Sequence, residues 1–162
     1  MSKLLFATLL LAAAAFAQHD HSPATQHDAM NARGDKAMGF DQDKTTHHFR
    51  VLADGGAIEV TANDPKDRDS ISQVRMHLGH IAQMFAAGDF SIPHEVHAAT
   101  PPGAAAMKAL RSDLKYTYEE IDRGGRVRIR SANPKAVAAV HDFLRYQIKE
   151  HRTGDPLAAA KP

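Results

Sequence analysis

A pattern of two strands followed by a helix occurs twice in this chain, and it constrains the fold more than any other feature of the sequence. Gly55-Gly56 recurs 69 positions later as Gly124-Gly125, and Pro65-Lys66 recurs at the same offset as Pro134-Lys135. In both copies, segments of alternating apolar and polar residues flank the glycine pair, and a segment with helical periodicity follows. We therefore predict an internal repeat of a ββα unit.

The alternating segments predict two antiparallel hairpins, each with one apolar and one charged face. With a four-residue loop in each hairpin, Phe49 would pair with Val60, and Tyr118 would pair with Ile129. The apolar face of such a sheet needs a cover, and each unit supplies a helix with an apolar stripe. The stripes are Val74, Leu78, Ile81 and Phe85, and then Val137, Val140, Leu144 and Ile148. The expected fold is α+β, a four-stranded antiparallel sheet covered on one face by two helices.

Short motifs predict where these two helices begin and end. Asp64 and Asn133 each precede a proline, which suits an N-cap residue followed by Pro at the first helical position. Gly88 and Gly154 each precede Asp and suit the position after the last helical turn.

The first 17 residues have the features of a secretory signal peptide. Lys3 supplies a positive charge, residues 4–16 are apolar apart from Thr8, and Ala15-Phe16-Ala17 fits the small-x-small pattern before a cleavage site. The apolar run is shorter than the roughly 20 residues that span a membrane. We expect cleavage after Ala17 and a periplasmic or secreted protein without a membrane span.

The remaining chain divides into a tail and one domain. Residues 18–43 are polar and lack a hydrophobic period, which predicts a mostly disordered tail. Residues 44–156 form the expected domain, and a C-terminal tail covers residues 157–162. Within the domain the repeats are 44–89 and 114–155, and the insertion 90–113 occurs in the first copy alone. Such an insertion is a place where function can be added to a duplicated fold.

Histidine is the unusual residue of the composition. The chain has 11 His, no Cys and a formal net charge of +1. The lack of Cys excludes a disulfide framework, a thiolate metal site and a Cys nucleophile. The balanced charge argues against a nucleic-acid partner. The GxSxG hydrolase motif and glycine-rich phosphate loops are absent, so the sequence favours a non-enzymatic binding protein.

Five residues form the candidate metal site. They are His77, His80, Met84, His94 and His97. Helical spacing puts the first three along one side of the first long helix, and a chain reversal near Gly88 can bring the last two back beside them. Imidazole nitrogen suits copper, zinc, nickel and iron, and thioether sulfur adds a preference for cuprous copper. An exported, His-rich chain without Cys favours copper, held for buffering or delivery.

The tail carries further histidines that could bind metal weakly. His19, His21 and His27 lie in this polar segment. A free amine at Gln18 followed by His suits weak, non-selective binding of Cu(II) or Ni(II). Solvated or structural histidines remain the alternative for all of these positions.

Two other functions stay open. One is a periplasmic protein–protein interaction module without metal. Its binding surface would consist of the insertion and an apolar segment that contains Met38 and Phe40, and His47 and His48 lie nearby at the start of the first strand. The other is a small enzyme that uses a His–carboxylate pair, which needs only spatial proximity. Exposed hairpin edges allow either a monomer or a homodimer.

Three longer motifs carry a resemblance to known sequences. They are MGFDQDKTTHHF, RMHLGHIAQMFAAGDF and HDFLRYQIKEHRTGD. Over residues 38–156 the chain resembles a group of small exported bacterial proteins. The resemblance implies neither an activity nor any catalytic residue.

Overall fold

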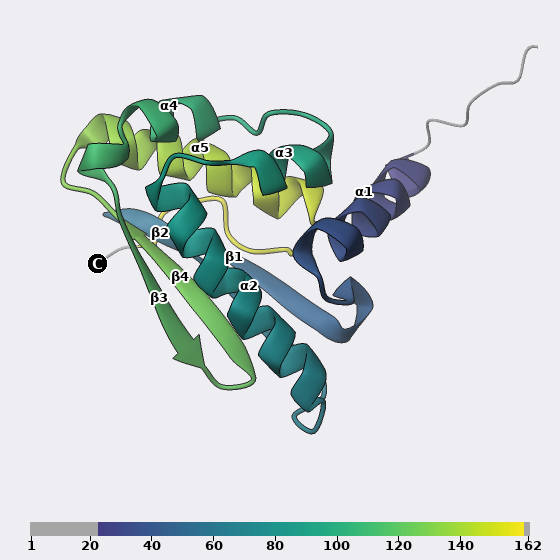
Figure 1. Ribbon diagram of the computed structural model, residues 1–162. Coiled ribbons are helices and arrows are strands. Elements are labelled where there is room, and N and C mark those ends of the chain that lie inside the picture. The colour runs from purple at the N-terminus through teal and green to yellow at the C-terminus, as the bar shows by residue number, and fades with distance from the viewer. Residues whose placement is uncertain (1–22, 161–162) are drawn as a thin grey trace, which may run out of the picture.

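The computed structural model describes residues 23–160 and contains one antiparallel sheet with its helices on one face (Figure 1). In chain order the elements are α1 (Pro23–Met38), η1 (Gln42–Lys44), β1 (Thr45–Leu52), β2 (Gly55–Ala62), α2 (Arg68–Ala86), α3 (Ser91–His97), α4 (Ala104–Ala109), η2 (Arg111–Asp113), β3 (Lys115–Ile121), β4 (Gly124–Arg130) and α5 (Pro134–Glu150). The expected α+β fold with two similar hairpins is confirmed.

The sheet has the strand order β1-β2-β4-β3, so the two hairpins join through their second strands. Pairing within each hairpin differs from the expected register by two residues. Phe49 pairs with Ile58, and Tyr118 pairs with Val127. The reason is that each hairpin turns through two residues rather than four, and Arg123 adopts a φ of 56° to close the second turn. A shift of two residues keeps every side chain on its expected face.

The two glycine pairs allow the central strands to approach closely. A Cβ at Gly124 would collide with the backbone of β2 at Val60, and a Cβ at Gly56 would collide with the side chain of Leu144 from α5. The repeated Gly-Gly motif therefore serves the contact between the two units and the fit of a helix on the sheet, in addition to the turns.

Each helix covers mainly the hairpin of the other unit. Helix α2 packs on β3 and β4, and α5 packs on β1 and β2 (Figure 1). The predicted apolar stripe of α2 is buried. In α5, Val137 of the predicted stripe is only half-buried, whereas Phe143, which is not part of that stripe, is buried. Asn133 caps α5 as expected, whereas α2 begins three residues after its proline and is capped by Asp67.

The segments outside the repeats pack on this frame. Residues 23–38, expected to lie in a mostly disordered tail, form helix α1 against α3, where Met30 is 3% exposed. Helix α1 is only weakly amphipathic, so packing rather than its own pattern stabilises it. The insertion forms α3 and α4. No helix within residues 23–160 is long and apolar enough to cross a bilayer.

The end of the described chain protects the edge of β1. The carboxylate of Asp155 accepts hydrogen bonds from Phe49 N–H and from the Arg50 guanidinium, at 2.9 and 2.8 Å. His48 Nδ1 lies 2.9 Å from the same carboxylate. Further on, Ala160 N–H donates to the Val51 carbonyl at 3.0 Å. Backbone groups of an edge strand that would otherwise be open are thus paired.

Candidate functional site

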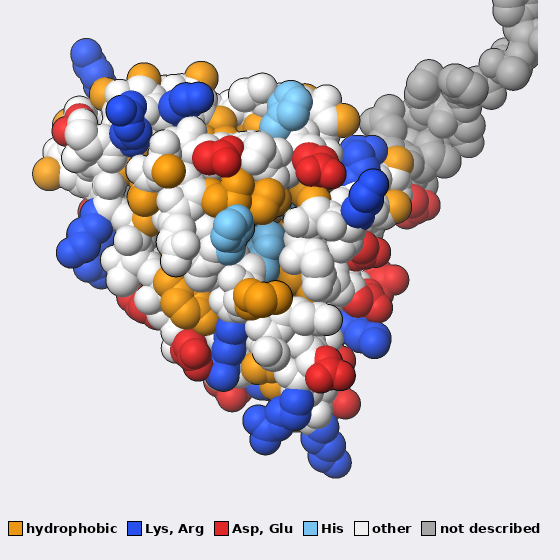
Figure 2. Space-filling view, viewed as in Figure 1, with side chains coloured by type: hydrophobic (Ala, Val, Ile, Leu, Met, Phe, Trp, Pro, Cys, Tyr) orange, Lys and Arg blue, Asp and Glu red, His pale blue; other side chains and the backbone are white. Residues whose placement is uncertain are grey.

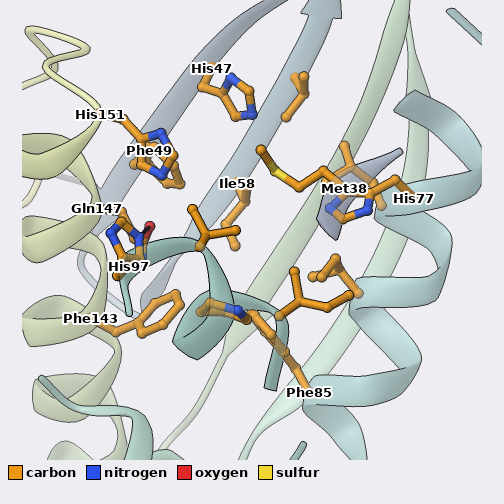
Figure 3. A pocket seen from close by; sticks show the side chains of 16 residues that line it. Met38, His47, Phe49, Ile58, His77, Phe85, His97, Phe143, Gln147 and His151 are labelled. Atoms are coloured by element: carbon orange, nitrogen blue, oxygen red, sulfur yellow. Dashed lines mark hydrogen bonds between the residues drawn. The ribbon is translucent and has the colours of Figure 1, made fainter. Parts of the chain in front are cut away.

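An apolar pocket lies between the sheet, α2, α3 and α5, and four imidazoles reach into it (Figure 3). Its volume is about 60 Å³. The imidazoles belong to His47, His77, His97 and His151, and apart from them Gln147 is the polar member of a lining built from aliphatic, aromatic and Met38 side chains. An apolar lining with a few convergent polar groups is typical of ligand sites, and this volume has room for no more than an ion or a water molecule.

Three of the imidazoles form a continuous row along one side of the pocket (Figure 3). The ring of His47 stacks on that of His151, with centroids 5.5 Å apart and planes inclined by 17°. The ring of His151 meets that of His97 edge-on at 5.2 Å. The three residues come from β1, the end of α5 and the last turn of α3.

The fourth imidazole, that of His77, lies across the pocket on α2 (Figure 3). Phe40 connects it with the row, because its ring is 5.3 Å from His77 and 5.8 Å from His47. Phe40 is 3% exposed and belongs to the main core. Met38, two residues before Phe40, lines the pocket, and Phe40 packs behind the lining.

The surroundings hold these imidazoles in the neutral form at pH 7. Burial, followed by the nearby His77 and His48, lowers the pKa of His47 to about 4. Burial, followed by His80, lowers the pKa of His77 to about 4. Burial also lowers the pKa of His97 and His151. A neutral imidazole offers one nitrogen lone pair to a metal ion or to a hydrogen-bond donor.

Some of the buried polar atoms at the pocket have no partner in the described part of the chain. They are His47 Nε2, His97 Nδ1 and Gln147 Nε2. His97 Nε2 donates to the Gln147 carbonyl oxygen at 2.8 Å, which leaves the lone pair on Nδ1. Buried polar groups are nearly always paired, so unpaired ones point to a bound water, ion or ligand.

Simple local patterns bring these side chains together. His47 shares the inward face of β1 with Phe49 and Val51, because side chains alternate along a strand. His151 follows Gln147 by four residues, so both lie on the same side of α5. In α3 the buried residues Pro93 and Val96 line the pocket, and His97, which directly follows Val96, lines it with them.

The structure divides the five residues of the predicted metal site. His77 and His97 line the pocket, on different sides of it. His80 and His94 are exposed, and Met84 is half-buried against the core outside the pocket lining. Figure 2 shows histidine side chains at the surface over α2, beside hydrophobic ones. Among residues 23–160 no three His, Asp or Glu side chains are placed to hold one metal ion.

The other candidate residues also separate. Met38 lines the pocket with His47, and Phe40 is buried behind them. His48 points to the opposite face of the sheet, where it contacts Asp155. Among the tail histidines, His27 lies on α1 beside a polar cleft, and His19 and His21 fall outside the described residues.

His151 and Gln147 are two polar residues of the pocket that the sequence did not single out. A signal for them exists, because both continue the helical spacing of Val140 and Leu144 at intervals of three and four residues. His151 is the C-cap residue of α5. Its burial against Phe49, at 5.4 Å between ring centroids, depends on a strand far away in the sequence.

Comparisons of the chain with protein-family models, with curated proteins and with solved structures found no match.

Proposed function

We propose that this protein binds cuprous copper in the apolar pocket, through the imidazoles of His47 and His77 and the thioether of Met38. The observation that carries the proposal is the buried, unpartnered Nε2 of the neutral His47 in a pocket that Met38 and His77 also line. Since these imidazoles are already unprotonated at pH 7, a metal ion would not have to displace protons from them.

The nature of the lining favours cuprous copper over other ions. Thioether sulfur and imidazole nitrogen are ligands that suit Cu(I), whereas Mg²⁺ and Ca²⁺ require oxygen ligands. Zn²⁺ is held by four ligands in structural sites, and the described residues contain no group of three His, Asp or Glu for it. Burial among apolar side chains also suits an ion of low charge.

We place this function outside the cytoplasm, on the strength of the apolar segment 4–16 and the Ala15-Phe16-Ala17 motif. Binding without chemistry fits copper buffering or delivery. The interaction module has less support, because Phe40, one of its proposed contact residues, is buried in the core.

The test is an anaerobic competition titration of Cu(I) between the protein and a coloured chelator. We expect one ion per chain, and at least about tenfold weaker binding in His47→Phe, equivalent to about 1.4 kcal/mol. Phe preserves the ring contacts with Phe40 and His151 while removing the nitrogens. Met38→Leu should also weaken binding while preserving an apolar side chain of similar size.

His80→Phe is the matched control, because His80 is exposed on the same helix as His77, three residues further on. The His80→Phe protein should bind Cu(I) with the same affinity as the unaltered protein. Unchanged affinity in His47→Phe, or an equal loss in His80→Phe, would contradict the assignment.

A further inference from the structure

A second cleft lies next to the imidazole pocket, between α1, α3 and the end of α5. Its volume is about 430 Å³, and its lining includes His27, Arg33, His97, Lys149, Glu150 and Arg152. This size is within the range of small-molecule sites. His97 lines both the cleft and the pocket, so the two spaces meet at its imidazole.

The charges around this cleft are mainly positive. Arg33, Lys149 and Arg152 supply three cationic groups, and Glu150 supplies one carboxylate. Arg33 is held in position because its Nε donates to the Val96 carbonyl of α3 at 2.9 Å. A guanidinium has five N–H donors, so this contact leaves further donors on Arg33. A cleft whose charges are mostly of one sign attracts ions of the opposite sign.

This charge distribution opposes the approach of a bare copper ion through the cleft. An anionic complex of the ion would be attracted instead, and the ion could then pass to the unpartnered Nδ1 of His97 at the boundary of the pocket. We infer that this cationic cleft receives copper as an anionic small-molecule chelate, one whose ligand carries carboxylate groups that do not themselves bind the ion. The inference rests on the proposed function and adds the form in which the ion arrives.

The experiment measures the rate of Cu(I) transfer to the protein from two donors of opposite charge. One donor is the anionic bicinchoninate complex, and the other is the cationic neocuproine complex. For each donor the rate of the variant is divided by that of the unaltered protein, which cancels the intrinsic exchange rate of the chelator. Loss of chelate absorbance in a stopped-flow instrument gives the rates.

Lys149→Glu is the informative variant, since Lys149 is exposed at the end of α5 and lines the cleft. At low ionic strength we expect transfer from bicinchoninate to slow by about three- to tenfold, and transfer from neocuproine to become faster. Salt should reduce both changes. Lys149→Gln should show smaller changes in the same directions and guards against misfolding of the charge reversal.

Lys135→Glu is the matched control, because Lys135 is exposed at the other end of the same helix. It should leave both ratios near one. Equal ratios for the two donors in Lys149→Glu would overturn the inference while leaving the copper site intact, which equilibrium titration would show. A protein that takes no Cu(I) from either donor would overturn both proposals.

Discussion

At the scale of single residues, the neutral imidazoles of the pocket link stability to pH. His47 and His77 have a pKa of about 4 in the folded protein, against 6.5 as the ordinary value. Between these values the unfolded chain binds more protons than the folded one. The contribution of these two imidazoles to the free energy of unfolding is therefore fully present above about pH 6.5, and it is lost as the pH falls through about 4.

We predict that the free energy of unfolding decreases steadily as the pH falls from 7 to 4. Each imidazole contributes at most about 1.4 kcal/mol per unit of pKa difference. Urea unfolding at a series of pH values measures the dependence. In His47→Phe the slope should become smaller, whereas His94→Gln, at an exposed position on α3, should leave it unchanged. A slope that persists undiminished in His47→Phe would show that other groups cause it.

At the scale of elements, a glycine inside a helix and a glycine in a central strand have opposite structural roles. Gly79 lies inside α2, and a Cβ at that position meets no atom within 4 Å. Gly124 begins β4, and a Cβ there would collide with the backbone of β2. Gly79 only lowers the stability of its helix, whereas Gly124 permits two strands to pair.

We therefore predict that Gly79→Ala and Gly124→Ala change stability in opposite directions. Ala at position 79 should stabilise the protein by about 0.5–1 kcal/mol, the usual difference in helix propensity. Ala at position 124 should destabilise it, because backbone atoms of Val60 cannot move aside as the end of a side chain can. Thermal unfolding followed by circular dichroism gives both values. A loss of stability in Gly79→Ala would mean that α2 is constrained at that turn.

At the scale of the whole molecule, the segment before β1 completes the pocket. Helix α1 packs on α3, and the chain then brings Met38 and Phe40 to the pocket wall and the core. The copper site proposed above therefore depends on residues outside both repeats. Phe40 of this segment packs against the rings of His47 and His77, and burial lowers the pKa of both to about 4.

We predict that Phe40→Ala both destabilises the protein and raises the pKa of His47 and His77 towards 6.5. Removing a buried Phe side chain costs about 3–5 kcal/mol, and the space it leaves admits water to the two imidazoles. An NMR titration of the imidazole C–H signals reports the pKa values, and denaturant unfolding reports the stability. Leu157→Ala, at a side chain that is 42% exposed, is the control. Unchanged pKa values in a folded Phe40→Ala protein would show that burial by this segment is not their cause.

The local pattern of the sequence was enough to predict most of the fold. Alternation along the strands, the repeated Gly-Gly motifs and the helical stripes depend on neighbours within a few residues, and they predicted the hairpins, the helices and their apolar faces. The hairpin register differed because loop length depends on which turn the backbone can close, and a φ of 56° at Arg123 is not visible in the residue pattern.

The candidate site was predicted only in part, for a different reason. Closeness in the sequence groups His80 and His94 with His77 and His97, although His80 and His94 are exposed to solvent. The tertiary structure instead combines a strand residue, His47, with imidazoles from three helical segments. Contacts between residues 47 and 151 have no local signature.

The repeated ββα unit, the apolar faces and the abundance of histidine without cysteine can all be read from the residues in order along the chain. Two features depend on the folded chain. Each helix covers the hairpin of the other unit, α2 the second and α5 the first, and particular histidines face one pocket. The physical reason is that local propensity and periodicity act over a few residues, whereas the neutrality of an imidazole depends on the burial that distant segments together provide.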